Sequence, residues 1–202
     1  METYIVKDVK CVNEVVEIHM KTFTGFFLTF LGKGFLKQLY KGFVEHNKSG
    51  LIVSVENGKV LGFCAYSEDL SGFYKYLIKK RLLYFAWYAI GAFFRNPKVL
   101  FRLLRAFSYS SESKREEAYI ELSSIGVLPE AKNKGVGSRL IQYLYDNCNK
   151  SSFSYIKLET DRDNNEGANC FYIKNGFVLD HSYETAEGRG MNEYRLYLGA
   201  KA

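Results

Sequence analysis

The segment of residues 126–140 constrains the fold of this chain more than any other stretch. It contains an extended run that breaks at Pro129, a short basic turn, and a helix that opens on Gly135 and Gly137. A strand that leads into a helix through a glycine-rich turn is typical of a mixed α/β domain. The helix also carries an apolar stripe with a four-residue step, formed by Val136, Leu140, Leu144 and Cys148.

The turn before this helix has the chemistry of an anion-binding site. A glycine-rich turn at a helix N-terminus exposes several backbone N–H groups and the positive end of the helix dipole, which together favour a phosphate or pyrophosphate. A Cβ atom at Gly135 or Gly137 would hold the anion away from the backbone. Lys132, Lys134 and Arg139 add positive charge. The turn therefore predicts a phosphorylated ligand, and the alternative is a left-handed turn and a helix start without a ligand.

The spacing of the glycines excludes two common nucleotide-binding loops. The chain has no Gly-x-x-x-x-Gly-Lys-Ser/Thr sequence, and the third glycine of the dinucleotide fingerprint would fall at Leu140. Residues 132–137 instead resemble the Gln/Arg-x-x-Gly-x-Gly/Ala signature of the GCN5-related N-acetyltransferase (GNAT) superfamily. Lys132 departs from this signature, because it keeps the charge and loses the planar hydrogen bonding of glutamine or arginine.

A second stretch, residues 165–177, resembles another signature of the same superfamily. The pattern Asn-x-x-Ala-x-x-Phe-Tyr-x-x-x-Gly-Phe is filled at every named position. Helix capping explains part of it without a function, since Asn164 or Asn165 can cap the start of a helix and Gly176 can end it. The strand–helix–strand–helix order carries both motifs over residues 119–178, which makes the resemblance more specific than either motif alone.

The resemblance implies an α/β (α+β) fold for a single domain over residues 1–202. Its sheet is mixed and mainly antiparallel, with a splayed central strand, helices on both faces and a helical insertion at about 70–111. A chain of 202 residues with 47% hydrophobic content agrees with one sizeable core. The sequence pattern predicts strands over 3–9, 51–55, 59–66, 118–127, 155–160, 177–183 and 191–198, helices over 12–22 and 34–46, and a hairpin turn at Asn57-Gly58.

The resemblance also implies acetyl coenzyme A as co-substrate and a primary amine as acceptor. In this superfamily the pantetheine arm lies beside the splayed strand and bonds to its backbone, much like an added strand. We expect the splayed segment at 124–127, with the Val127 N–H donating to the thioester oxygen. The residues matched to cofactor contacts are Ile125, Val127, Lys132, Asn133, Lys134, Gly135, Val136, Gly137, Ser138, Asn165 and Tyr172.

Two side chains are candidates for proton transfer. Tyr172 matches the tyrosine that serves as general acid toward the coenzyme A sulfur, and its alternative is an aromatic ring packed on the sheet. Glu121 lies six positions before Val127, a register that resembles the base glutamate of the histone-acetylating branch. Strand alternation puts 121, 123, 125 and 127 on one face before any bulge. The alternatives are an ion-paired or solvated Glu121, with Ser123 or an ordered water chain as base.

The insertion distinguishes this chain from short members of the superfamily. Residues 70–111 contain eight Lys/Arg and no Asp or Glu, interleaved with many aromatic residues, and the uncharged run 82–94 is too short to span a bilayer. Asn96-Pro97 can start a second helix. Three interpretations remain open: a helical hairpin that packs its aromatics on the sheet, a basic surface on anionic lipid, and a dimer contact or substrate lid.

The acceptor and the compartment are less constrained. Phe23, Phe26, Phe27, Phe30 and Phe35 predict an aromatic mouth that suits an amino sugar or another small amine. A lipid-linked acceptor at a membrane, or a coenzyme A-binding domain without turnover, are the alternatives. We expect a cytoplasmic protein, with a peripheral site at the inner face of the membrane as the variant, because no signal peptide is visible and the four cysteines fit a reduced core. No metal or nucleic-acid motif is present.

Overall fold

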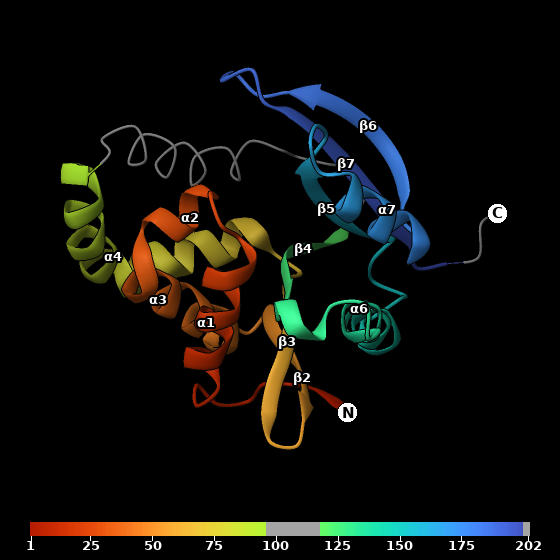
Figure 1. The fold of residues 1–202 in the computed structure, drawn as a ribbon, viewed down its shortest axis with the longest axis horizontal. Helices are drawn as coiled ribbons and strands as arrows, with labels where there is room; N and C mark the ends of the chain where they lie inside the picture. Colours follow the sequence, from red (N-terminus) through yellow and green to blue (C-terminus); the bar gives the residue numbers. More distant parts are fainter. Residues whose placement is uncertain (96–117, 200–202) are drawn as a thin grey trace.

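The computed structural model describes residues 1–95 and 118–199, apart from the side chains of residues 27 and 89–95. Within this part, seven strands form one sheet in the order β1-β2-β3-β4-β5-β7-β6 (Figure 1). Strands β4 and β5 pair in parallel and every other neighbouring pair is antiparallel, which confirms the mixed, mainly antiparallel sheet. The strands are β1 (Glu2–Ile5), β2 (Ser49–Glu56), β3 (Lys59–Ser67), β4 (Tyr119–Val127), β5 (Tyr155–Asp161), β6 (Val178–Glu184) and β7 (Gly190–Tyr197).

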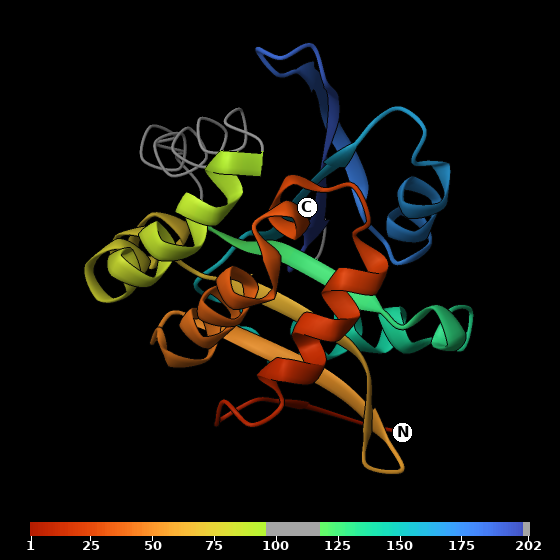
Figure 2. The same cartoon turned by 60° about the vertical axis from the view of Figure 1, so that its left-hand side comes forward.

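Helices cover both faces of the sheet, as the sequence predicted. The helices of the described residues form one group on one side and a second group on the other, as Figures 1 and 2 show. The first group is α1 (Val12–Thr22), α2 (Phe27–Phe30), α3 (Gly32–Glu45) and α4 (Leu70–Arg95), and the second is α6 (Val136–Asn147) and α7 (Glu166–Lys174). A short 3₁₀ turn, η1 (Pro129–Ala131), links β4 to the α6 side. None of the helices in the described part of the chain is both long and apolar enough to cross a lipid bilayer.

Local sequence signals explain several of these boundaries. Asn57 and Gly58 both have positive φ, as a two-residue hairpin turn requires. Strand β1 ends at Ile5 and not at residue 9, because Asp8 accepts a hydrogen bond from the Lys10 N–H at 2.8 Å and forms a local turn.

The cysteine prediction needs a correction. All four cysteines are free, and Cys64 is buried in the core as expected. Cys170, however, is exposed, because it lies on the outward side of α7. Cys148, the last member of the predicted apolar stripe, is half-buried and follows the end of α6.

The insertion begins as the long helix α4, which packs mainly on α3. Phe73 stacks on Phe43 with ring centroids 4.2 Å apart, and Phe85 lies 4.6 Å from Phe35. Gly42 permits this approach, because a Cβ there would overlap the Leu77 side chain. Phe35 is therefore a core residue and not part of an aromatic mouth. The second predicted helix, from residue 96, lies outside the described residues.

A buried polar chain joins α1 to the sheet through α3. His19 is 3% exposed, and its Nδ1 lies 2.6 Å from the Tyr40 hydroxyl. Tyr40 in turn lies 3.3 Å from Ser124 Oγ on β4. Burial lowers the pKa of His19 to about 4. The folded protein therefore holds this imidazole neutral over a pH range in which the unfolded chain protonates it.

We expect this histidine to make the protein acid-sensitive. Between about pH 6.5 and about 4 the unfolded state binds a proton that the folded state does not, so stability falls as pH falls, by about 3 kcal/mol in total. Urea unfolding at several pH values should show a weaker slope in His19→Gln, which keeps hydrogen bonding to Tyr40. The control is His181→Gln, which changes an exposed histidine and should retain the wild-type dependence of stability on pH. Equal slopes in all three proteins would contradict the assignment.

Candidate active site

The parallel strands β4 and β5 separate soon after they meet. Their pairing is confined to Tyr119–Glu121 against Tyr155–Lys157. Beyond it β4 continues to Val127 and β5 to Asp161 with no pairing between them. The central strand is therefore splayed from its neighbour, as the sequence resemblance implied, and the two strands have diverged at residues 124–127.

The backbone of β4 offers hydrogen-bonding groups toward this gap. Leu128 N donates to Leu61 O at 2.8 Å, so these two residues form a hydrogen-bonded pair of the β3–β4 ladder. Such pairs alternate with pairs whose N–H and C=O groups point away from each other. The next pair, Gly62 with Val127, is of that second kind, and so is the pair of Ile125 two residues earlier. The N–H groups of Ile125 and Val127 thus point to the side where β5 diverges, where a ligand main chain can bind.

A β-bulge in β4 changes which side chains share a face. Ala65 pairs with Ser124 and Tyr66 with Leu122, so Ser123 is the extra residue. Ser124 contacts Tyr40 of α3, and Glu121 interacts with Tyr74 of α4, so both lie on the α3/α4 side. Val127 lies on the other side, beside Gly137 of α6. Simple alternation placed Glu121 on the face of Ile125 and Val127, and the bulge puts them on opposite faces.

The glycine-rich turn leads directly into α6. Asn133 and Gly135 both adopt positive φ, at 61° and 77°, and Arg139 N donates a backbone hydrogen bond to Gly135 O at 3.0 Å. The N–H groups of residues 136–138 precede that bond, and the helix start has no side-chain cap among the described residues. The side chains of Lys132 and Lys134 are exposed at this turn. The turn has the donors and the charge that a pyrophosphate needs.

The two glycines of the turn have different roles. Around Gly135 a Cβ would meet nothing within 4 Å, so its positive φ is the reason for glycine. At Gly137 a Cβ would lie 2.8 Å from the ring of Phe171, so glycine there lets α6 and α7 approach each other. Helix packing therefore explains part of the motif.

Tyr172 projects from α7 onto the same side of the sheet as α6. Its ring is 9% exposed and lies among Phe171, Phe177 and Tyr194, with centroids 5.4 to 6.0 Å apart. Burial raises the pKa of Tyr172, and the neighbouring Cys64 adds to the rise. Its hydroxyl has no hydrogen-bond partner among the described residues. The phenol stays protonated at neutral pH, as a general acid must.

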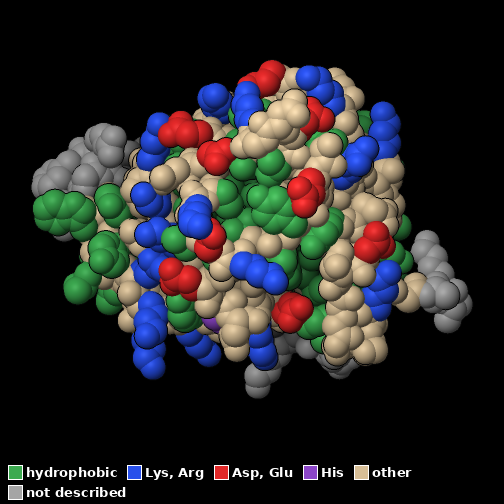
Figure 3. All heavy atoms as spheres, turned by 90° about the horizontal axis from the view of Figure 1, so that it is seen from below, with side chains coloured by type: hydrophobic (Ala, Val, Ile, Leu, Met, Phe, Trp, Pro, Cys, Tyr) green, Lys and Arg blue, Asp and Glu red, His purple; other side chains and the backbone are tan. Residues whose placement is uncertain are grey.

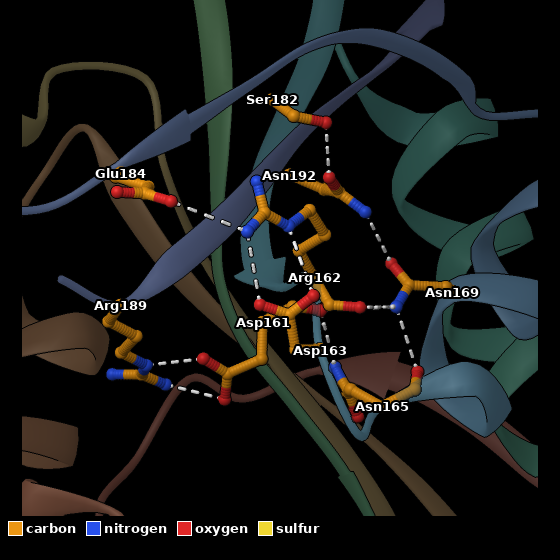
Figure 4. Close-up of polar contacts among 9 residues, drawn as sticks. All are labelled: Asp161, Arg162, Asp163, Asn165, Asn169, Ser182, Glu184, Arg189 and Asn192. Atoms are coloured by element: carbon orange, nitrogen blue, oxygen red, sulfur yellow. Dashed lines mark hydrogen bonds and ion pairs between the residues drawn. The ribbon is translucent and has the colours of Figure 1, made fainter.

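Asn165 does not cap α7 with its side chain, which corrects the capping interpretation. Its Nδ2 donates to Thr160 Oγ1 at 2.8 Å and to Asp161 O at 3.2 Å, at the end of β5. Asn169, which the motif leaves unspecified, donates to Asp161 O at 3.1 Å and accepts from Asn192 Nδ2 at 3.1 Å (Figure 4). Both asparagines therefore fix the start of α7 to the end of β5, beside the gap.

Glu121 belongs to a buried charged cluster where β4 and β5 part. It is 8% exposed, and Lys157 Nζ lies 3.5 Å from its Oε2. The same ammonium lies 2.7 Å from Glu159 and 3.7 Å from Glu193. Burial raises the pKa of Glu121 to about 7, against the opposing effect of Lys157. A carboxylate with this pKa can accept a proton at neutral pH.

Two segments that are distant in the sequence meet at the end of β5, and we refer to this place, formed by Asp161, Arg189 and Phe26, as the mouth. Arg189, in the β6–β7 turn, makes two hydrogen bonds to Asp161 (Figure 4), and its guanidinium lies 5.5 Å from the centroid of the Phe26 ring. Phe26 precedes α2 and is partly exposed. Asp161, Glu159 and Lys157 share one face of β5, because alternate strand residues point the same way. This side of the gap is polar: the carboxylates of Glu121, Glu159 and Asp161 lie against the cations of Lys157 and Arg189, and an aromatic ring lies at its edge.

One group of potential metal ligands occurs in the described part of the chain, namely Asp180, His181 and Glu193. Arg195 lies 2.9 Å from the Asp180 carboxylate and 3.0 Å from that of Glu193. Both acids are thus already neutralised by an arginine, and the group is an ion-pair network of β6 and β7.

Comparison with known proteins gives consistent results. A model of the acetyltransferase (GNAT) family matches residues 12–177. An uncharacterized N-acetyltransferase of Schizosaccharomyces pombe is 30% identical over 78 residues, which are 38% of this chain and 51% of that protein. The chain thus spans about half the length of the curated relative that it matches.

Two solved structures show the likeness in fold. One from Desulfovibrio desulfuricans, described as an acetyltransferase of the GNAT family, has a TM-score of 0.65 at 14% identity and covers 98% of this chain and 99% of its own. One from Bacillus anthracis, described as a streptothricin acetyltransferase in complex with acetyl coenzyme A, has a TM-score of 0.52 at 16% identity, over 79% of this chain and 68% of its own. Together with the family match, they confirm the resemblance seen in the two motifs: the chain belongs to the GNAT acetyltransferase family.

Proposed function

We propose that this protein transfers the acetyl group of acetyl coenzyme A to a primary amine of a small molecule, by direct attack while both substrates are bound. The observation that carries the proposal is the gap between β4 and β5, which opens beside the first turn of α6. Family membership and the acetyl coenzyme A complex of the Bacillus anthracis neighbour support the same donor.

The donor would be held by backbone groups. Ile125 and Val127 offer N–H groups to the pantetheine amides, and the turn of residues 132–138 offers donors and positive charge to the pyrophosphate. Asn165 lies at the same end of the gap, although its amide already bonds to β5. The Val127 N–H would stabilise the negative charge that develops on the thioester oxygen during attack, which is an oxyanion-hole role.

The two candidate proton-transfer groups lie on opposite faces of the sheet, with the gap between them. Glu121 lies on the same face of the sheet as Asp161 and would take the proton of the attacking ammonium. Tyr172 packs on the other face near Cys64, and would give its proton to the departing thiolate. An acceptor and a donor that enter from opposite sides would meet between these groups. This arrangement suits a ternary complex.

The charges at the mouth suit an amine acceptor, because the three carboxylates there outnumber the two cations, Lys157 and Arg189. Glu121, Glu159 and Asp161 lie on the face that the acceptor would approach, and the partly exposed Phe26 suits a sugar ring or a short carbon chain. An amino sugar or another small amine metabolite has both features. A lipid-linked acceptor is the second candidate, favoured by the exposed apolar side chains of α4.

Calorimetric titration with acetyl coenzyme A, beside its 3′-dephospho form, tests the donor site. We expect a Kd on the order of micromolar for the full ligand and weaker binding without the 3′-phosphate, because Lys132, Lys134 and Arg139 supply positive charge near the turn. A screen of amines by thiol release would then identify the acceptor. A folded protein that binds neither ligand would refute the proposal, and one that binds without transfer to any amine would favour a sensor.

Replacing Tyr172 with phenylalanine should lower kcat by about a hundredfold, because the thiolate would leave without an acid. Affinity for acetyl coenzyme A should remain, since the ring still packs on Phe171 and Phe177. The control is Tyr143→Phe on α6, which removes a hydroxyl away from the gap. An unchanged kcat in the Tyr172 variant would assign the proton to water.

A further inference from the structure

Several of the most exposed large apolar side chains of the described residues gather on one helix. On α4, Leu82 is 56%, Leu83 84%, Tyr84 55% and Trp87 75% exposed. Leu83 and Trp87 are the two most exposed large apolar side chains in the described part of the protein. We refer to these four residues, with Lys75, Lys79 and Lys80, as the exposed α4 surface. A patch of this kind on a soluble domain marks an interaction site.

The exposure does not come from a loosely attached helix. The opposite side of α4 packs on α3 along most of the described length, through Phe73 and Phe85 and as far as Tyr88, which fills the space above Gly34. Arg81 is nearly buried and bonds to Gln38 and Glu45 of α3. The helix is thus held in one orientation, and that orientation presents Leu83 and Trp87 to the outside.

The charge of the surface indicates what it contacts. Lys75, Lys79, Leu83 and Trp87 follow one another at four-residue steps, so they form one stripe that is basic at its start and apolar at its end. The three lysines are exposed and form no ion pair with any described residue. The sequence of α4 contains no Asp or Glu. Figure 3 shows apolar side chains at the end of the molecule where α4 ends, beside a band of Lys and Arg.

We propose that the exposed α4 surface docks on an anionic lipid bilayer. Its lysines match the charge of anionic headgroups, and leucine and tryptophan are the side chains that favour the boundary between headgroups and acyl chains. Because the stripe becomes apolar toward Trp87, the C-terminal half of the described helix enters this boundary while Lys75 and Lys79 stay with the phosphates.

Docking would also orient the acceptor mouth. Helix α2 and the C-terminal end of α4 lie on the same side of the fold in Figures 1 and 2. Phe26, which precedes α2, and Phe30, its last residue, are partly to largely exposed. Lipid contact at α4 would therefore bring this side toward the membrane, where an amine on a lipid carrier could enter. This last step rests on the proposed function, whereas the docking itself does not.

Trp87 is the single tryptophan of the chain, so its fluorescence reports on this surface alone. The probes are vesicles of phosphatidylcholine with and without a third of phosphatidylglycerol. We expect co-sedimentation and a blue shift of Trp87 emission with the anionic vesicles, both reversed by salt. Lys79→Glu with Lys80→Glu should weaken vesicle binding by at least about tenfold. Leu83→Glu should abolish the blue shift. Arg81 is left unchanged because it holds α4 to α3.

Matched controls separate docking from folding and from catalysis. Val9→Glu places the same charge on an apolar residue outside α4, which is 38% exposed, and should leave vesicle binding intact. Every variant should still bind acetyl coenzyme A, so a loss of docking does not depend on the donor site. Unshifted emission and no sedimentation with either vesicle would overturn the proposal. A dimer that Leu83→Glu dissociates, or a blue-shifted Trp87 in the lipid-free monomer, would also overturn it, because another surface would then cover α4.

Discussion

Gly135→Asp should bind acetyl coenzyme A about a hundredfold more weakly than Gly135→Asn. Both side chains tolerate the left-handed backbone at this position, where φ is 77°, and a Cβ there has open space. The two variants differ in one charge. A carboxylate about 5 Å from a phosphate costs about 3 kcal/mol at an effective dielectric constant of about 20, which is about a hundredfold in Kd. Calorimetric titration of the two proteins measures this difference.

Gly135 is the better place for this test than Gly137. A Cβ at Gly137 would press on Phe171, so a substitution there would disturb the packing of α6 on α7 and weaken binding for another reason. Thermal unfolding of both Gly135 variants should give similar midpoints. Equal affinities for acetyl coenzyme A in two folded variants would mean that the glycine turn is not the pyrophosphate site.

Glu121→Gln should lower kcat by about a hundredfold or more, and it should also remove a pH dependence. Because the pKa of Glu121 is raised to about 7, the wild-type carboxyl is largely protonated below that pH and cannot accept the ammonium proton. The kcat of the wild type should therefore rise as pH increases through about 7 and then level off. Glutamine has the same shape and no basic oxygen, so its residual rate should lack this rise.

The neighbouring carboxylate provides the comparison. Glu159 also lies against Lys157, at 2.7 Å, so Glu159→Gln removes a negative charge from the same cluster. That variant should keep a rise of kcat with pH, moved to lower pH because one repelling carboxylate is gone. If both variants lose the rise equally, the cluster acts only through its total charge and Glu121 is an ion-paired strand residue.

Local signals predicted the parts of the fold that depend on a few neighbouring residues. The hairpin at Asn57-Gly58 follows from two residues that accept positive φ, and α1 begins and ends at the predicted residues 12 and 22. Gly176 has the left-handed conformation expected at the end of α7. The glycine turn before α6 was predicted for the same reason, because its conformation depends on the residues of the turn itself.

The features that give the site its chemistry depend on contacts between distant residues. Ser123 looks like any strand residue in the sequence, and its bulge appears only when β3 and β4 are in register. Lys157 looks like an ordinary polar residue of an alternating strand in the sequence, and its three carboxylate partners come from β4, β5 and β7. The bond between Asn169 and Asn192 joins α7 to β7 in the same way. Strand pairing decides these contacts, and a single sequence does not show it.

The short pairing of β4 with β5 has a mechanical consequence. The sheet consists of two parts, β1 to β4 and β5, β7 and β6. Three residues on each of β4 and β5 form the strand pairing between these parts. The pair of neighbouring strands with the fewest paired residues in the sheet therefore lies at the proposed reaction site. A co-substrate whose amides bond to the unpaired part of β4 would add connections between the two parts of the sheet. The protein would then be most rigid with the co-substrate bound and most flexible when it exchanges its ligands.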